Sequence, residues 1–231
     1  MVRRLFFAGL VCLNTAAFSQ QIPSGYKLVY EESFDKRDSY DGFTFTQPDK
    51  WLLSGGQTGK ALEFTGISDY QPPFRSPHTI ALIATVAVGS FILEADLLQT
   101  GREYGHRDMC VVFGFQDPSH FYYAHIASKM DDNAHQLMVV NEAPRKKISL
   151  FTTPGVEWGQ GQWHKVRVER TLTDGKIRIF FDGQLIQEAV DASFANGYIG
   201  FGSFDDSGKV DNIRLWAPES RRDVCQHFQK K

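Results

Sequence analysis

The sequence is poor in cysteine, in net charge and in long apolar runs. Three cysteines in 231 residues are too few for a fold held together by several disulfides. A formal net charge of −2 offers no concentrated basic face for a phosphate backbone, so no nucleic-acid partner is expected. After residue 20 no apolar run approaches the roughly 18 residues of a membrane helix, so membrane insertion is not expected either.

The first 19 residues have the pattern of an export signal. Two arginines at positions 3 and 4 precede an apolar run over 5–13, and Ala-Phe-Ser at 17–19 is a small-x-small cleavage site. Cys12 lies in a poor match to a lipoprotein box, which disfavours a lipid anchor. The pattern therefore predicts a secreted or periplasmic protein after removal of a signal peptide, residues 1–19.

Long helical periodicity is also missing, and short alternating runs take its place. Apolar and polar residues alternate between clusters of Gly, Pro, Asp and Asn, the pattern of an antiparallel β-sandwich. We expect strands at 26–34, 60–66, 79–86, 90–99, 107–116, 120–128, 136–141, 147–151, 163–172, 176–182, 185–189, 197–204 and 209–216. With no repeat or linker, this predicts one domain over residues 20–217 and a polar tail, residues 218–231, that is disordered or a short helix.

The alternation also sorts side chains between the two faces of each strand. Met109, Val111, Phe113 and Phe115 form one apolar row, so their strand turns its polar residues the other way. If the strands at 90–99, 107–116 and 120–128 are neighbours on one concave sheet, a single surface carries Glu94, Asp96, His106, Asp108, Tyr123 and His125. Such a surface suits an oligo- or polysaccharide, whose hydroxyls need polar partners and whose ring face stacks on an aromatic.

Several segments together are similar to a known fold family. The chain resembles the middle of concanavalin A-like (laminin G-like) jelly rolls in three segments: FILEAD at 91–96, VVFGFQD at 111–117 and FYY at 121–123. It resembles the second half of these jelly rolls in four further segments: WHKVRV at 163–168, FDG at 181–183, GYIGFG at 197–202 and VDNIRL at 210–215. Among bacterial proteins the pattern is most similar to 3-keto-disaccharide hydrolase domains. The resemblance covers about residues 26–216 and implies an all-β jelly roll of two antiparallel sheets, a fold that hosts lectins, hydrolases and lyases alike.

Two kinds of sugar chemistry remain open alongside simple recognition. Glu94 and Asp96 are similar to the start of the Glu-x-Asp-x-x-Glu strand of family 16 glycoside hydrolases, but Gln99 stands where the third carboxylate is needed. A polysaccharide lyase needs a base, here His125 or Tyr123, and a group that neutralises a uronate, here Arg107. The lyase strand motifs Arg-x-Glu-Leu and Gln-x-His are absent. The further alternatives are a non-catalytic adhesion or matrix module and ordinary polar strand faces.

The remaining candidates are two sugar contacts, a metal site and the cysteines. Asn141 and Trp158 are candidate substrate contacts, Trp158 as an exposed stacking platform in the 155–161 loop. The family resemblance implies a structural calcium ion between Glu32 on the first strand and Asp211 on the last, although Asp211 could equally cap a turn or pair with Arg214. The seven histidines show no spacing such as His-x-x-x-His, so zinc is not expected.

Cys110 and Cys225 are the two cysteines that follow the signal. Cys110 alternates with apolar neighbours, which favours a buried free thiol over a bridge to Cys225, without excluding the bridge. The sequence predicts no oligomeric state.

Overall fold

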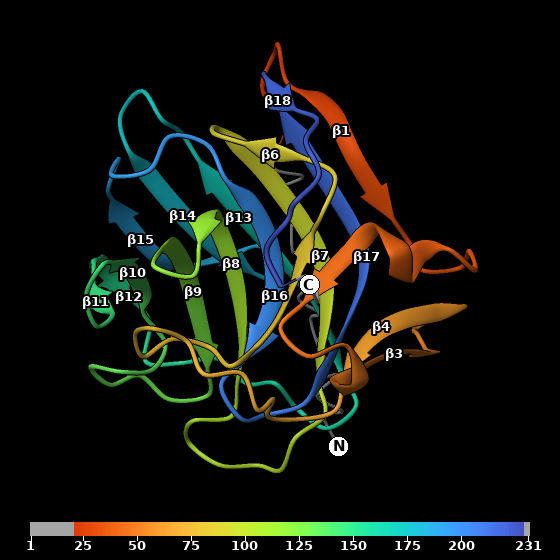
Figure 1. The fold of residues 1–231 in the computed structure, drawn as a ribbon. Coiled ribbons are helices and arrows are strands. Elements are labelled where there is room, and N and C mark those ends of the chain that lie inside the picture. Colours follow the sequence, from red (N-terminus) through yellow and green to blue (C-terminus); the bar gives the residue numbers. More distant parts are fainter. Residues whose placement is uncertain (1–20, 229–231) are drawn as a thin grey trace, which may run out of the picture.

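A computed structural model describes residues 21–228 as a sandwich of two antiparallel sheets (Figure 1). The predicted all-β, concanavalin A-like jelly roll is therefore confirmed. The predicted signal peptide lies outside the described residues. Within the described part of the chain, no helix has the length and apolar character needed to cross a membrane.

The nine-stranded sheet has the order β12-β15-β14-β13-β7-β17-β4-β3, with β1 paired to β17. Its strands are β1 (Lys27–Glu32), β3 (Trp51–Gly55), β4 (Lys60–Phe64), β7 (Phe91–Gln99), β12 (Ser149–Thr152), β13 (Trp163–Arg170), β14 (Lys176–Phe181), β15 (Gln184–Val190) and β17 (Gly208–Ala217).

The seven-stranded sheet has the order β11-β10-β9-β8-β16-β5-β2. Its strands are β2 (Phe43–Phe45), β5 (Thr79–Ile83), β8 (Asp108–Asp117), β9 (His120–Ala127), β10 (Leu137–Asn141), β11 (Lys146–Lys147) and β16 (Tyr198–Ser203). Two short 3-10 helices, η1 (Ser39–Gly42) and η2 (Pro48–Lys50), flank β2, and β6 (Ala87–Val88) pairs with β18 (Ser220–Arg221).

The strand predictions are largely confirmed, with instructive differences. The Asp182-Gly183 turn has φ values of 49° and 81°, as a type I′ hairpin requires. The strand expected at 147–151 is two short strands, because the chain passes there from one sheet to the other. The short strands β2 and β3 were not predicted.

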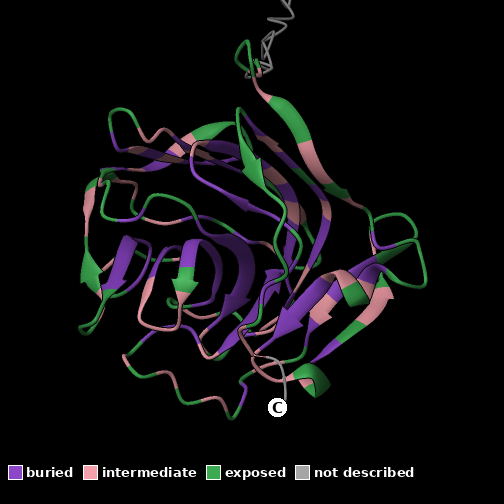
Figure 2. Ribbon diagram, turned by 45° about the horizontal axis from the view of Figure 1, so that its top comes forward, coloured by how far each residue is buried: buried purple, intermediate pink, exposed green. Residues whose placement is uncertain are grey.

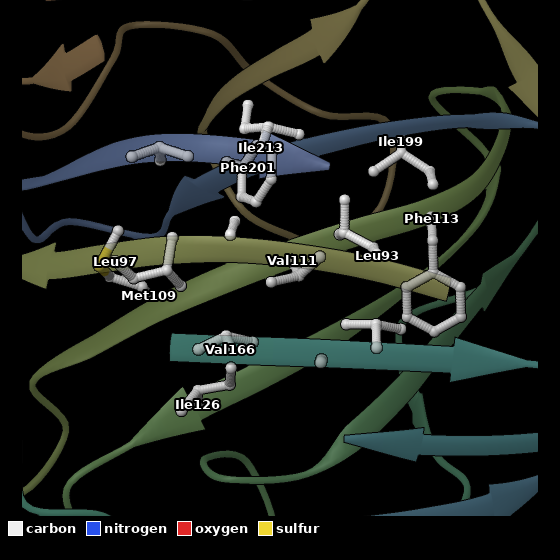
Figure 3. Close-up of a cluster of buried hydrophobic side chains, with 14 of the residues drawn as sticks. Leu93, Leu97, Met109, Val111, Phe113, Ile126, Val166, Ile199, Phe201 and Ile213 are labelled. Carbon is white, nitrogen blue, oxygen red and sulfur yellow. The ribbon is translucent and has the colours of Figure 1, made fainter. Parts of the chain in front are cut away.

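The main core fills the space between the sheets. Figure 3 shows Leu93 and Leu97 of β7 lying against Met109, Val111 and Phe113 of β8, all buried. The apolar row predicted for β8 is therefore confirmed for Met109, Val111 and Phe113. It is wrong for Phe115, which lies in the cluster on the opposite face, because the irregularity at Gly114 (φ 58°) reverses the alternation. Burial of such side chains stabilises the fold by about 1.5 to 3 kcal/mol each.

A second apolar cluster covers the opposite face of the seven-stranded sheet. It includes Cys110, Phe121 and Tyr123, with Phe74 and Phe228 packed against it. The central strands β8, β9 and β16 therefore bury side chains on both of their faces, and Figure 2 shows the middle of this sheet mostly in purple. Cys110 is a buried free thiol, the alternative that the alternation favoured.

The C-terminal tail is part of this second cluster. Ser220 and Arg221 form β18, Cys225 is fully buried, and the carbonyl oxygen of His227 accepts a hydrogen bond from Thr44 Oγ1 at 2.6 Å. Phe228 packs edge-on against Tyr70. The expectation of a disordered or helical tail is therefore wrong over residues 218–228, because apolar side chains at 225 and 228 anchor it to the sheet.

Candidate functional site

A cleft of about 420 Å³ lies at one end of the seven-stranded sheet. Its walls come from β8, β9 and five of the connections between strands. The side chains that give it chemical character are Arg75, His78, Asp108, His125, Arg145 and Phe204. A cleft with an aromatic ring, two arginines, imidazoles and carboxylates is suited to a polar ligand with an apolar face.

Asp108 and His125 form the buried floor of the cleft. The side chains are on neighbouring strands, with Asp108 opposite Ala127 and Cys110 opposite His125 in the β8–β9 register. His125 Nε2 lies 2.9 Å from Asp108 Oδ2, and the two residues are only 4% and 2% exposed. The prediction that these two residues share a surface is confirmed.

Backbone and hydroxyl groups fix both members of this pair. His125 Nδ1 lies 2.9 Å from the carbonyl oxygen of Asn133. The loop that carries Asn133 is held by Asp131, whose Oδ1 accepts hydrogen bonds from the backbone N–H groups of Asn133 and Ala134. Ser203 Oγ donates to Asp108 Oδ1 at 2.8 Å. The pair is thus held in one geometry before any ligand arrives.

Asp206 closes the floor on the other side of Asp108. Its Oδ2 accepts hydrogen bonds from the Asp108 backbone N–H at 2.8 Å and from the Tyr104 hydroxyl at 2.9 Å. Burial, reinforced by the nearby charge of Asp108, raises the pKa of Asp206 to about 6. Asp206 therefore holds the backbone of Asp108 in place from this side.

Arg145 and Phe204 form one wall. The Arg145 guanidinium lies 4.7 Å from the centre of the Phe204 ring and donates to Tyr123 Oη and Asn133 Oδ1, each at 3.2 Å. The Phe204 ring also packs against His125, with ring centres 5.3 Å apart. Stacking on the ring leaves the guanidinium at the cleft, where it can meet a ligand oxygen.

Tyr123 projects from the same face of the sheet as His125 and His106 lines the same cleft, as predicted, but neither belongs to the cleft floor. Tyr123 is fully buried behind this wall, and burial raises the pKa of its hydroxyl well above the usual value, which disfavours a phenolate base. His106 is exposed on the rim, where its Nε2 lies 2.7 Å from Asp131 Oδ2.

Glu94 and Asp96 are not in this cleft. The expectation that their strand neighbours β8 and β9 is wrong, because β7 belongs to the nine-stranded sheet, between β13 and β17. Glu94 pairs with Arg167 at 2.7 Å and Asp96 with Lys165 at 2.6 Å on the outer face of that sheet. The alternation correctly turned both carboxylates away from the core but gave no information on which sheet they join.

Three further predicted site residues also lie elsewhere. Arg107 turns away from the cleft, because successive residues of an extended chain point to opposite faces and Asp108 points into the cleft. The Arg107 guanidinium donates instead to Gln99 and to the carbonyl oxygen of Gly159. Trp158 is 1% exposed within the main core, so it is no stacking platform. Asn141 is exposed at the far end of β10, opposite His120. None of these three side chains lines the cleft.

The cleft is lined instead by four side chains that were not predicted as site residues: Arg75, His78, Arg145 and Phe204. Each sits on a loop or at a strand end, where the two-residue period that sorts strand faces does not apply. Three prolines at 69–77 indicate a surface loop, but they do not place that loop over the sheet.

The proposed calcium ligands, Glu32 and Asp211, lie on the paired strands β1 and β17. Asp211 is fully buried, and its Oδ2 has no hydrogen-bond partner among the described residues. This oxygen and the carbonyl oxygen of Lys60 both lie 2.9 Å from where a Cβ on Gly56 would stand. Burial, then the charges of Asp96, Asp35 and Glu32, raises the pKa of Asp211 to about 6. An orphaned carboxylate oxygen among acids and a carbonyl fits a hard cation.

The alternative roles of Asp211 are resolved by its neighbours. Its Oδ1 accepts a hydrogen bond from the Asn212 backbone N–H within strand β17, at an irregularity in the pairing with β7, so the alternative of a turn cap is wrong. Arg214 pairs with Glu31 at 2.9 Å, so the alternative pairing of Asp211 with Arg214 is wrong.

Comparisons with known proteins support the fold. No protein-family model matches the sequence, and no curated protein matches it. Among solved structures, the chain is similar to the carbohydrate-binding module CBM66 from Bacillus subtilis (15% identity, TM-score 0.52, covering 74% of this chain and 93% of that one). It is also similar to domain 4 of AbnA, a GH43 extracellular arabinanase from Geobacillus stearothermophilus in complex with arabinotriose (15% identity, TM-score 0.54, covering 83% and 93%).

A third similar structure is a protein of unknown function with a galectin-like fold from Bacillus subtilis (10% identity, TM-score 0.55, covering 87% and 100%). At these identities the likeness establishes a shared jelly roll, and the chemistry has to be argued from the cleft.

Proposed function

We propose that this chain is a carbohydrate-active jelly-roll domain that binds an extracellular oligo- or polysaccharide in the cleft between Arg145, Phe204 and the Asp108–His125 floor. The observation that carries the proposal is the wall in which Arg145 stacks on Phe204 directly above a fixed carboxylate and imidazole. Sugars need this combination, because ring faces stack on aromatics while hydroxyls bond to charged groups. The similarity to CBM66 and to an arabinotriose-bound domain supports the same ligand class.

Cleavage of the bound glycan is the second candidate. His125 at the cleft floor is oriented by a backbone carbonyl and lies beside a carboxylate, an arrangement suited to proton transfer. Arg75 and Arg145 would neutralise a uronate carboxylate in β-elimination, the role first predicted for Arg107. Export of the chain stays a prediction from its first 19 residues.

The test is a panel of neutral and uronate polysaccharides. Affinity gel electrophoresis reports binding, ultraviolet absorbance reports the unsaturated ends of a lyase, and reducing-sugar release reports hydrolysis. Binding without either product supports recognition alone. Absence of binding and of both products would contradict the proposal and leave an adhesion or matrix role on another face.

Phe204→Ala is expected to weaken binding of a retained glycan about tenfold, equivalent to about 1.4 kcal/mol, because the stacking surface is lost. Isothermal titration measures the change. Phe151→Ala is the matched control, since Phe151 is a partly exposed phenylalanine on β12 of the other sheet. Equal losses in both variants, or none in Phe204→Ala with its fold intact, would place the glycan elsewhere.

We also propose that Glu32, Asp211 and the carbonyl oxygen of Lys60 hold a structural Ca²⁺ ion that ties β1 to β17. At a Ca²⁺ concentration about 100 times Kd, binding adds about 2.7 kcal/mol to the stability. For a chain of this size that raises Tm by roughly 5 to 10 °C. Thermal melts of chelator-treated protein with and without added Ca²⁺ measure the shift.

Asp211→Asn is expected to abolish the Ca²⁺ response, because it removes the charge of the orphaned carboxylate. Glu31→Gln, which alters an exposed acid beside Glu32, is expected to keep it. A Ca²⁺ shift of the same size in Asp211→Asn and in the unaltered chain would show that the ion binds elsewhere.

A further inference from the structure

Three potential metal donors meet on the outer face of β8 and β9. Cys110 and His125 are directly opposite in the strand register, and Asp108 lies two residues before Cys110 on the same face. One ligand atom from each residue lies within 4.8 Å of the other two, and all three residues are buried. Strand pairing, rather than any spacing in the sequence, brings these donors together.

The contact between His125 and Asp108 is close but is not a hydrogen bond of normal geometry. The carbonyl oxygen of Asn133 can only accept, so the ring proton of His125 lies on Nδ1. In the neutral ring Nε2 then carries a lone pair, yet it faces Asp108 Oδ2 at 2.9 Å. Nε2 is buried and has no hydrogen bond of acceptable geometry among the described residues. Two buried acceptors held this close require a positive charge between them, either a second ring proton or a metal ion in its place.

Cys110 supplies the third donor at the same point. Its Sγ lies 3.9 Å from Asp108 Oδ1. Burial, with the charge of Asp108 beside it, raises the pKa of the Cys110 thiol. A bound divalent ion reverses that effect, because a coordinating thiol loses its proton to the metal.

We infer that Asp108, Cys110 and His125 form a binding site for a divalent transition-metal ion of the zinc class. Zn²⁺ takes this set of thiolate, imidazole and carboxylate ligands, and a site with three protein ligands keeps its fourth position open. Here Asp108 and His125 line the cleft while Cys110 lies buried behind them, so the open position faces the cleft.

The groups around the donors are those that orient metal ligands. The Asn133 carbonyl holds the far nitrogen of His125, and the Ser203 hydroxyl holds the second oxygen of Asp108. The acidic residues on the other side of Asp108 do not compete for this role. Asp206 Oδ2 is already occupied by two donors, and Asp205 is exposed.

Titration of the chelator-treated full chain with Co²⁺ tests the site. The expected result is a thiolate-to-Co²⁺ charge-transfer band that saturates at one ion per chain and disappears when Zn²⁺ is added. Cys110→Ser should lose the band, and His125→Asn should weaken Co²⁺ binding at least tenfold. Cys225→Ser is the matched control, because it alters the other buried cysteine, and it should keep the band.

X-ray absorption of the Co²⁺-loaded unaltered chain gives a readout that needs no variant, and it should show one sulfur ligand at about 2.3 Å. A shell of oxygen and nitrogen alone, a band that survives in Cys110→Ser, or no band at all would overturn the inference. The titration contains no carbohydrate, so metal binding and glycan binding succeed or fail separately.

Discussion

Asp108→Ala is expected to lower the free energy of unfolding by about 3 to 5 kcal/mol, because it removes one partner of a buried pair and leaves the other uncompensated. Asp108 is 2% exposed, its Oδ2 faces His125, and its Oδ1 is the acceptor for Ser203 Oγ. Losing the carboxylate therefore leaves a buried imidazole and a buried hydroxyl without their partner. Urea denaturation followed by tryptophan fluorescence measures the loss.

Asp205→Ala is the control in the same cleft. Asp205 is exposed and lines the cleft beside Asp108, so its removal should change stability by no more than about 0.5 kcal/mol. If Asp108→Ala were as stable as Asp205→Ala, the buried pair would have no part in holding the cleft floor.

Gly202→Ala is expected to have an effect of similar size through the backbone. Gly202 lies in β16 between β5 and β8, and a Cβ there would collide with the carbonyl oxygen of Thr79. The strand must move away from β5, which also displaces Ser203, the partner of Asp108. We expect a loss of about 3 kcal/mol or more, at the upper end for overpacking. Yield of folded protein and urea denaturation measure it.

Gly55→Ala provides the comparison, because Gly55 ends strand β3 and a Cβ there meets no atom within 4 Å. It should unfold at nearly the same denaturant concentration as the unaltered chain. A Gly202→Ala protein with unchanged stability would mean that β16 and β5 do not pack as closely as described.

The hairpin of β8 and β9 shows what the sequence could predict. Apolar alternation predicted which side chains face the core as far as Phe113, and failed at Phe115, where the irregularity at Gly114 reverses the faces. The expected strands 107–116 and 120–128 follow each other closely, which favoured pairing between them. Asp108 and His125 were therefore placed together correctly. The same period put Glu94 and Asp96 outside the core but on the wrong sheet, because alternation within a strand says nothing about its partner strands.

The cleft walls show what the sequence could not predict. Arg145 and Phe204 meet only because β10 and β16 flank the β8–β9 hairpin, and both residues lie on connections rather than within strands. Trp158 failed for a related reason, since a glycine-rich loop was assumed to be exposed while this one turns its tryptophan into the core. Loop residues are positioned by long-range packing, which no local pattern reports.

The central claim is that the glycan occupies the cleft on the seven-stranded sheet. Hydrogen exchange of the full chain, with and without a glycan that it retains, tests this most directly. We predict slower exchange in the 66–78 loop, the 128–136 loop and residues 203–206, which surround Arg145, Phe204 and His125. Slower exchange confined to the outer face of the nine-stranded sheet around Glu94 and Asp96 would contradict the account.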